Sequence, residues 1–433
     1  MPATPLVGAT TAARVLRSPK IWIFPAVVIG LVTLLLSLLY VGGIVNPRGH
    51  LHRLPIGLVN NDRGALVNGQ RLDLGAQITA GIAGAPDPQH QISWRQLDQQ
   101  GAMNGLASAK LYAVLEVNAG FSAAVTALGA PAPGAPAPPT ITVLTNPGAG
   151  SLASSLASGI AQTAAHAAST QLGSTLKAPP TSSAAERLLL ADPVTIVTAV
   201  GHPIGAHSGL GLTAFYYTLL LVLAGFLGAT VISNGVDVAL GYAASELGPL
   251  RTQRPTVPIS RTQTLLVTGT MSVGLSVLTS SLIMLATVAI LGMDASHLPL
   301  LWVFSFCATA TIGLGAQALL AAFGGIGQLI AMFVFIALAL PSSGATVPLA
   351  ALPTFYRVLA EFEPMRQLTD GVRSILYFDA RADAGLTRAW IMMAVGLAAA
   401  LAFGFAMTRY YDRKGLHRIH PADPDSPQDD GTL

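Results

Sequence analysis

The sequence predicts an α-helical polytopic membrane protein of six transmembrane helices, with an extracytoplasmic α/β domain between the first and second helices. Hydrophobic residues make up 52% of the 433 residues and charged residues only 10%, which is typical of membrane proteins that carry one soluble portion. Several long segments contain no Asp, Glu, Lys, Arg or His. A soluble protein cannot bury so much uninterrupted apolar surface, whereas a bilayer core about 30 Å thick requires about 20 such residues per helix.

Six charge-free segments are the predicted spans. They are Ile21–Val45, Leu210–Ser233, Thr262–Leu291, Leu298–Phe323, Gly325–Leu340 and Ala389–Thr408. The first could instead be a cleaved signal peptide, but the apolar region of a signal peptide is only about 7 to 15 residues long and ends at a small-residue cleavage site. We therefore expect an uncleaved signal anchor.

The basic residues predict the orientation, because short cytoplasmic loops of membrane proteins are enriched in Lys and Arg. The segments before residue 21, from 234 to 261 and after 408 hold ten of the 23 Lys and Arg residues. Residues 341–388 carry five arginines although they must lie outside, but five acidic residues accompany them, which is typical of a folded element. The expected location is the plasma membrane, with both termini cytoplasmic.

These assignments divide the chain into five parts. Their predicted bounds are 1–20 for a cytoplasmic N-terminus, 21–45 for the first span, 46–208 for the extracytoplasmic α/β domain, 209–408 for a five-helix membrane domain, and 409–433 for a cytoplasmic, partly disordered tail. Within the membrane domain we expect a cytoplasmic loop at 234–261 and an outer re-entrant hairpin at 341–377.

Residues 46–208 alternate between strand-like and helix-like patterns, which is typical of a compact α/β module. The expected strands are Leu54–Val59, Gln91–Leu97, Leu111–Val117 and Thr140–Thr145, and the expected helices are Gln99–Lys110, a short one from Gly120 and Ser151–Leu176. We expect Val194–Val200 to lead the chain back to the membrane.

The long helix at Ser151–Leu176 carries small and apolar residues four apart on one stripe. The simpler interpretation is that this helix covers the module's own sheet, and the alternative is that the stripe packs against a second helix, for example in a partner subunit. The stripe comprises Leu152, Leu156, Ile160, Ala164, Ala168, Leu172 and Leu176.

An ordered set of short motifs resembles the outer domain of the YhgE/Pip family. These are Leu54-Pro-Ile-Gly-Leu-Val-Asn-Asn-Asp-Arg-Gly-Ala65, then Trp94, then Gly105–Ala113, then Gly120-Phe-Ser122. Asn118 stands where that family usually has proline. The family belongs to the type-2 ABC exporter membrane subunits, and the match continues in order over most of the chain. The resemblance implies a type-2 ABC exporter-like fold.

The same resemblance implies that the loop at 234–261 couples the membrane domain to a partner subunit. In such exporters the loop after the second span docks on a separate nucleotide-binding subunit, which implies a cytoplasmic ATP-binding-cassette ATPase as partner. An ordinary charged loop that enforces topology is the alternative for any single residue. If the loop forms a short interfacial helix, Val236–Leu247 would present its apolar face. The candidate coupling residues, with Glu246 and Arg251 preferred, are Glu246, Gly248, Pro249, Arg251 and Arg254.

Prolines and a glycine predict an irregular outer hairpin after the fifth span. Two short helices are expected within Phe355–Phe362 and Gln367–Leu376, and in the exporters that this segment resembles such helices close the exit path. We expect Arg373 to pair with Glu361, Glu363 or a lipid headgroup, with an ion pair favoured. The candidate residues of the hairpin are Pro341, Gly344, Pro348, Pro353, Pro364 and Arg373.

The spans contain no ionisable group at mid-membrane depth, whereas ion-driven carriers require protonation or ion sites along their path. Gln317 and Ser280 are candidate path-lining residues, although hydrogen bonding between helices is the more common use of such side chains. No Gly-x-x-x-x-Gly-Lys-Ser/Thr phosphate loop occurs. Energy for transport must then come from another chain.

Two functions fit these observations. The first is the membrane subunit of an ATP-driven exporter that forms a homo- or hetero-dimer and moves an amphiphilic or envelope-associated substrate outward. The alternative is a cell-surface receptor or secretion-accessory scaffold of the YhgE/Pip type, for phage adsorption or type VII secretion. We expect no enzymatic activity, cofactor or metal. Membrane lipid is an expected partner and nucleic acid is not, because a net charge of +3 is small and scattered.

Overall fold

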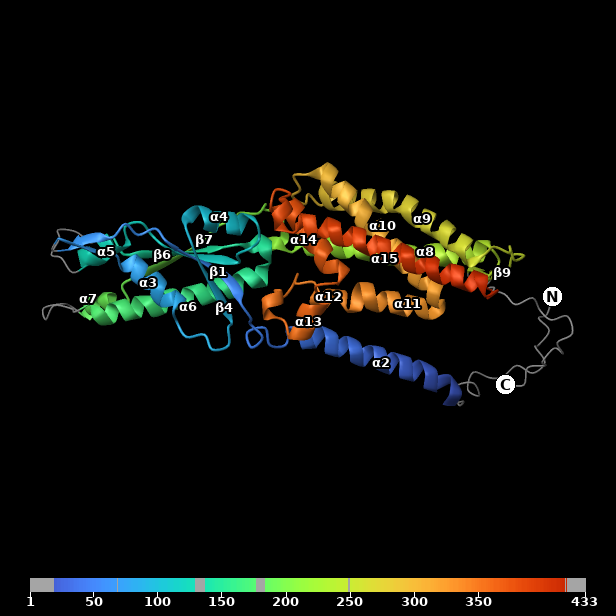
Figure 1. Cartoon of the computed structure of the whole chain (residues 1–433), viewed down its shortest axis with the longest axis horizontal. Helices are drawn as coiled ribbons and strands as arrows, with labels where there is room; N and C mark the ends of the chain where they lie inside the picture. Colours follow the sequence, from blue (N-terminus) through green and yellow to red (C-terminus); the bar gives the residue numbers. More distant parts are fainter. Residues whose placement is uncertain are drawn as a thin grey trace, which may run out of the picture.

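The structure, a computed structural model, describes residues 19–67, 69–128, 137–176, 184–247, 250–416 and 418. The molecule is elongated, with a sheet domain (residues 46–208) at one end and a helical block (residues 19–45 and 209–416) at the other (Figure 1). We call the end of the helical block that touches the sheet domain the near end, and the opposite end the far end.

Six helices among the described residues are long and apolar enough to cross a membrane, so the chain is a multi-pass membrane protein. Their positions agree with the predicted spans to within a few residues. They are α2 (Pro19–Ile44), α8 (Thr213–Ala239), α9 (Arg261–Met284) continued by the π-helix η3 (Leu285–Ile290), α10 (Leu298–Phe323), α11 (Gly325–Met332) continued by the π-helix η4 (Phe333–Ala337) and by α12 (Ala339–Ser342), and α15 (Leu386–Arg413).

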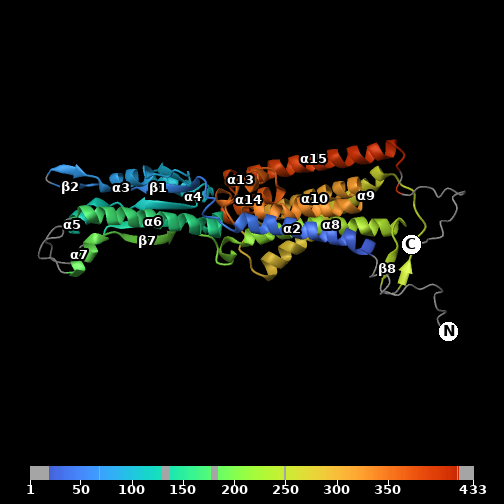
Figure 2. The same cartoon turned by 90° about the horizontal axis from the view of Figure 1, so that it is seen from below.

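Helix α10 is the centre of the block and α2 is its periphery. Helix α10 packs against α8, α9 and α15, and half of the residues in its most apolar stretch are buried. Only 6% of the corresponding stretch of α2 is buried, and this helix lies along α12 at the edge of the block (Figure 1). Figure 2 shows α2 lying along the same direction as α8. Most of the α2 surface is therefore free to face lipid.

The fifth span shows how a proline is accommodated in an apolar helix. The amide of Leu338 bonds the carbonyl of Phe333, five residues back, at 2.9 Å. Pro341 follows in α12, and because proline lacks an N–H and crowds the carbonyl four residues earlier, the helix widens to a π turn before it. The span ends at Ser342, just before Gly344, whose φ is +67°.

Two further helices and several short turns complete the helical block. They are the 3-10 helices η2 (Gly209–Gly211), η5 (Leu349–Ala351) and η6 (Ala382–Ala384), the strands β8 (Ser245–Leu247) and β9 (Leu250–Thr252), and the helices α13 (Thr354–Leu359) and α14 (Pro364–Tyr377). Helices α13 and α14 are the two short helices that the sequence predicts for the hairpin at 341–377.

The sheet domain is built on a mixed five-stranded sheet. The strand order is β4-β1-β5-β6-β7, where β1 is parallel to β4 and β5, β6 is antiparallel to β5, and β7 is parallel to β6. The strands are β1 (Leu54–Asn60), β4 (Ile92–Leu97), β5 (Ala113–Val117), β6 (Thr140–Thr145) and β7 (Thr195–Val200), with a small separate hairpin of β2 (Ala65–Val67) and β3 (Gln70–Leu72).

Helices cover both faces of this sheet. Helix α4 (Gln99–Ala107) covers one face through Leu106, and α3, α5 and α6 cover the other, where Phe121, Ile141 and Ala161 are fully buried or nearly so. The bounds on that face are α3 (Leu74–Ala83), α5 (Phe121–Leu128), the 3-10 turn η1 (Pro147–Ala149), α6 (Ser151–Thr175) and α7 (Ala184–Ala191). The predicted strands and helices are confirmed, whereas β2, β3, α3 and α7 were not predicted, and the segment from Val194 to Val200 is an edge strand of the sheet.

Asp62, which follows β1, joins the first turns of two helices. Its Oδ1 accepts a hydrogen bond from the Ser122 amide of α5 at 3.0 Å, and its Oδ2 accepts bonds from the Ser122 hydroxyl and from the Gly75 amide of α3. Burial raises the pKa of Asp62, but the bonds from Ser122, Gly75 and Gly64 outweigh it and hold this pKa below 3.8. The carboxylate thus stabilises both helix N-termini against the sheet.

Tyr377, the last residue of α14, joins the sheet domain to the helical block. Its hydroxyl accepts a hydrogen bond from the Ala214 amide at 3.1 Å, donates to the Ser208 carbonyl at 3.2 Å and lies 2.6 Å from the Thr213 hydroxyl. The His202 side chain donates to the Tyr377 carbonyl at 2.8 Å. The end of the sheet domain and the start of α8 therefore share one side chain.

Replacing Asp62 should destabilise the sheet domain, because the hydrogen bonds between Asp62 and Ser122 are lost. We expect Asp62→Asn and Ser122→Ala each to lower the free energy of unfolding by about 1–3 kcal/mol, since each leaves buried polar groups unpaired. Because folding depresses the Asp62 pKa, its contribution is present above about pH 3.8 and is lost as the pH falls below that value. Thermal unfolding of the full-length protein measures both effects.

The double variant distinguishes the loss of the Asp62–Ser122 interaction from a nonspecific loss of stability. Asp62→Asn combined with Ser122→Ala should cost less than the sum of the single changes. Asp98 caps α4 and has no bond to Ser122, so Asp98→Asn with Ser122→Ala should be additive. Additive losses for the Asp62 and Ser122 pair would contradict this account.

Candidate functional site

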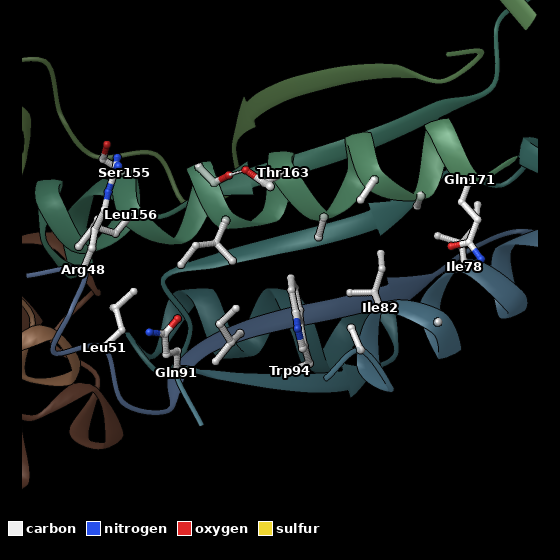
Figure 3. A pocket seen from close by; sticks show the side chains of 18 of the residues that line it. Arg48, Leu51, Ile78, Ile82, Gln91, Trp94, Ser155, Leu156, Thr163 and Gln171 are labelled. Carbon is white, nitrogen blue, oxygen red and sulfur yellow. Dashed lines mark hydrogen bonds between the residues drawn. The ribbon is translucent and has the colours of Figure 1, made fainter. Parts of the chain in front are cut away.

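A long groove runs along the sheet domain between α6 on one side and α3 with β4 on the other (Figure 3). Its volume is about 1430 Å³, which exceeds the roughly 300–1,000 Å³ usual for pockets that hold small molecules. The lining residues on α6 extend from Leu152 to Thr175. At a rise of about 1.5 Å per residue, this wall is about 35 Å long.

Two adjacent stripes of α6 explain why a groove exists. The stripe that faces the sheet is made of small residues, among them Ala157, Ala161 and Ala165, which are fully buried. Small side chains let the helix lie close to the sheet. The larger residues one position away, Leu156 and Ile160 among them, are only half-buried and line the groove. The interpretation that this helix covers the module's own sheet is confirmed, and the residues of the predicted stripe from Leu156 to Leu176 pack against the same core while remaining half-buried.

The floor of the groove is the edge strand β4. Trp94 and Ile92 pair in register with Ile56 and Leu54, whose side chains are fully buried in the core on the α6 side. Neighbouring residues of paired strands project from the same face, so Trp94 and Ile92 point toward the helices, but they remain half-buried because α6 and α3 do not close over them. Figure 3 shows the Trp94 ring standing in the groove.

The groove carries a single charged residue. Of its 27 lining residues only Arg48 is ionised at neutral pH, and none is acidic. Arg48 lies at the near end of the groove beside Ser155 and Leu156 (Figure 3). No hydrogen bond or ion pair of the Arg48 guanidinium occurs within the part of the chain that the structure describes. The groove thus combines an apolar wall with one exposed cation at its near end.

The apolar wall continues into the helical block at the near end. Residues 45–49, which directly follow α2, line the groove. Beneath them, Leu51 and Leu156 pack with Leu39 of α2 against Tyr356 of α13, whose hydroxyl donates to the Leu39 carbonyl at 2.9 Å. The groove therefore begins where the first span ends.

The far end carries the predicted coupling loop, with a different conformation from the one expected. Helix α8 continues through Val236 and ends at Ala239, no separate interfacial helix forms over Val236–Leu247, and β8 and β9 form a two-stranded hairpin. Gly241 explains this end, since its φ of +77° is readily adopted by glycine in the left-handed turn that stops a helix. Gly248 and Pro249 lie outside the described residues.

The preferred coupling residues face each other across this hairpin. Glu246 and Arg251 are register partners, with Arg251 Nε 3.6 Å from Glu246 Oε1, and both side chains are about two-thirds exposed or more. Arg254 is also exposed. At this exposure the pair contributes at most about 1 kcal/mol to stability, so both charges are available to a partner at little cost.

Two carboxylates connect the region around the hairpin to three helices. Asp237 of α8 forms a bidentate pair with Arg418 at 2.6 and 2.7 Å. Asp412 of α15 accepts the amides of Arg261 and Thr262, the first two residues of α9, at 2.9 and 3.0 Å. These contacts hold the end of α8 and the start of α9, the two helices that flank the loop.

In the segment at 341–377, Arg373 forms a structural ion pair as favoured, but its partner is Asp370, and the expected partners Glu361 and Glu363 were wrong. Arg373 is buried, with Nη1 3.8 Å from Asp370 and Nη2 donating to the Ala345 carbonyl at 3.0 Å. Glu361 binds Arg388 at 2.6 Å, and Glu363 caps α14. The prolines delimit the short helices, since Pro348 and Pro353 precede η5 and α13, and Pro364 begins α14.

Gln317 is 2% exposed and connects three helices. Its amide donates to the Ala229 carbonyl of α8 at 3.0 Å and to the Ser272 hydroxyl of α9 at 3.4 Å. This is the helix-to-helix role that the sequence left open beside path-lining. The Ser280 hydroxyl is buried and has no hydrogen-bond partner within the described ranges. No group of three His, Cys, Asp or Glu side chains suited to a metal ion occurs among the residues searched, which are the described ones.

Glu363 should give the protein a pH-dependent stability. Burial raises the pKa of Glu363 to about 8, against the lowering effect of hydrogen bonds from the Met365 and Arg366 amides. Because the folded pKa lies above the ordinary value of 4.5, folding favours the protonated acid, and stability should fall as the pH rises from 4.5 to about 8. Thermal unfolding midpoints of the full-length protein across this range measure the fall.

The isosteric variant Glu363→Gln tests whether the pH dependence of stability comes from the Glu363 carboxyl group. Glu363→Gln stays neutral, so its unfolding midpoint should not show this fall over the same pH range. Glu361→Gln removes an exposed carboxylate and should retain the wild-type pH dependence. Equal pH dependence in Glu363→Gln and wild type would contradict the assignment.

Comparison with known proteins identifies a family and no closer relative. No curated protein matches the chain, and no solved structure does. The sequence model of the family described as "Protein of unknown function (DUF3533)" matches residues 26–396, which include α2, the whole sheet domain and most of the helical block. The match covers well over half of the 433 residues, and the chain therefore belongs to the DUF3533 family.

Proposed function

We propose that this protein is the membrane subunit of an ATP-driven exporter that moves an amphiphilic or envelope-associated substrate outward across the plasma membrane. The far end of the helical block is then cytoplasmic and binds a separate ATP-binding-cassette ATPase. The sheet domain lies outside, and the subunit works as a dimer. The resemblance to YhgE/Pip proteins and type-2 ABC exporters supports this proposal.

One observation carries it: an exposed, charged hairpin lies in the loop between α8 and α9, at the end opposite the sheet domain. The β8–β9 hairpin offers Glu246 and Arg251 to a partner, and the Asp237 and Asp412 contacts tie its surroundings to α8, α9 and α15. A charged, exposed surface in the loop that joins two helices of the block suits a subunit that a partner drives.

The interior of the block supports an external source of energy. The central parts of the six spans contain no Asp, Glu, Lys, Arg or His, and buried polar side chains such as Gln317 and Tyr217 bond neighbouring helices. An ion-driven carrier needs titratable groups at that depth. The proposal accordingly assigns energy coupling to the partner ATPase.

A charge swap across the hairpin tests the coupling. Glu246→Arg with Arg251→Glu retains an ion pair within the hairpin but reverses the charges presented to a partner. We expect tagged full-length protein to co-purify with an ATPase from its native membrane, and the swap to reduce that recovery by about tenfold, because two charge-assisted contacts become repulsive. Mass spectrometry of the eluate quantifies the ATPase.

A matched swap at the near end is the control. Glu361→Arg with Arg388→Glu exchanges another exposed ion pair and should leave ATPase recovery unchanged. If no ATPase is recovered, and sealed vesicles containing the purified protein accumulate substrate from an ion gradient alone, the exporter proposal is wrong. Recovery of an extracytoplasmic protein without any ATPase would favour the receptor or scaffold function instead.

A further inference from the structure

We propose that the groove of the sheet domain binds one acyl chain of an anionic membrane amphiphile, with its headgroup at Arg48 and its chain along α6. The proposed ligand is the cargo class of the exporter described above. That the bound molecule is being transported rests on the proposed exporter function. The binding site itself is defined by the groove alone.

The dimensions fit an extended hydrocarbon chain. The α6 wall from Leu152 to Thr175 is about 35 Å long. A bilayer core of about 30 Å holds two leaflets, so a single lipid chain extends about 15 Å. The groove is therefore long enough for the whole chain of a membrane amphiphile, which would lie along a little under half of its length.

Most of the lining fits hydrocarbon, beside a minority of neutral polar side chains such as Gln77, Gln91 and Gln171. Large apolar side chains face the groove from both sides and from its floor. They are Leu156 and Ile160 on α6, Ile78 and Ile82 on α3, and Trp94 on β4. Burying apolar area against such walls is favourable without directional bonds. A ligand whose only required feature is a flexible apolar chain matches this surface.

The single charge fixes the orientation of the ligand. Arg48 lies at the near end, follows the end of α2 by four residues and has no side-chain partner among the described residues. A guanidinium binds phosphate or carboxylate oxygens through charge-assisted hydrogen bonds. The absence of acidic residues from the lining removes any competing internal partner.

The position of the near end supplies the route from the bilayer. Residues 45–49 line the groove directly after the first span, and most of the surface of that span is exposed. Leu39 of α2 and Leu156 of the groove belong to one apolar cluster around Tyr356. The first span and the groove are therefore adjacent at the near end, which gives an acyl chain that leaves the membrane along α2 a short route to the groove.

A second copy of this chain is a poorer occupant. If the same face of another protomer filled the groove, the two surfaces would be identical, as in any two-fold interface. Neither surface has an acidic residue to meet Arg48. An anionic amphiphile satisfies both the apolar wall and the cation.

Photo-crosslinking of the full-length protein tests the proposal without ATP or any ATPase. The protein is placed in phosphatidylcholine vesicles that contain phosphatidylglycerol with a diazirine in its acyl chain, and adducts are mapped by mass spectrometry. We expect adducts on the groove faces of α3, β4 and α6. Adducts confined to the six spans would overturn the proposal.

Two pairs of variants separate groove binding from nonspecific labelling. A side chain added at Gly159 meets no atom within 4 Å, so Gly159→Phe should fold and fill the groove, reducing groove adducts by about tenfold. Thr170→Phe, on an exposed part of α6 outside the lining, should not change them. Unchanged groove labelling in Gly159→Phe would overturn the proposal.

The headgroup contact has its own pair of variants. Arg48→Gln should reduce groove adducts by about tenfold, since one charge-assisted contact is lost, whereas Arg48→Lys and the nearby exposed Arg53→Gln should retain them. Photo-reactive diacylglycerol, which has no charged headgroup, should label the groove about tenfold less and should not respond to Arg48→Gln. Equal labelling by both lipids would overturn the assignment of an anionic ligand.

A cysteine on the groove wall tests for a second copy. Thr163→Cys lines the groove, and the only natural cysteine, Cys307, lies in α10. A disulfide-linked dimer through position 163 that excludes the lipid label would show that another protomer occupies the groove and would overturn the proposal.

Because no ATP is used, a groove that takes no lipid leaves the exporter proposal standing. Groove labelling without ATP-dependent export in vesicles would contradict the exporter proposal alone.

Discussion

The attachment of the sheet domain at Tyr377 is the contact on which the rest of this structure depends. One hydroxyl contacts Ser208 at the end of the sheet domain and the first turn of α8, and the carbonyl of the same residue binds His202. The aromatic ring of His202 also stacks on Phe378 at 5.2 Å. These contacts attach the sheet domain to the near end of the helical block, where the groove starts at the end of α2.

The use of small residues on α6 then determines what the sheet domain can do. A helix with large residues on its sheet-facing stripe would lie farther from the sheet, whereas alanine and serine bring it close and leave the neighbouring leucine and isoleucine half-covered. Half-covered apolar side chains in a long groove are costly in water and mark a binding surface. The structure thus has an apolar groove at the near end and a charged hairpin at the far end, joined by helices that carry no charge at their centres.

Much of this fold could be predicted from the sequence, because hydropathy and alternation are local signals. The six spans and the strands β1, β4, β5 and β6 follow from them. The hairpin at β8 and β9 was missed because an apolar face over Val236–Leu247 outweighed Gly241, whose left-handed backbone ends α8.

Contacts between distant residues could not be predicted in this way. The pairing of Asp62 with Ser122, the partners of Arg373 and the bond from Gln317 to Ala229 all depend on how separate elements meet. The sequence contains one signal of the groove, which is the stripe on α6 that carries leucine and isoleucine at positions where small residues would suffice. Periodicity alone does not tell which of two adjacent stripes faces the sheet. Arg48 becomes informative only once it is seen at the end of that groove.

The most direct test of the central claim is an electron cryo-microscopy map of the full-length protein in nanodiscs that contain phosphatidylglycerol. Our account predicts a continuous, elongated density between α6 and α3 that is not protein, ending in a headgroup beside Arg48 and absent in the Gly159→Phe variant. A groove that is empty, or that is filled by α6 of a second protomer, would contradict it.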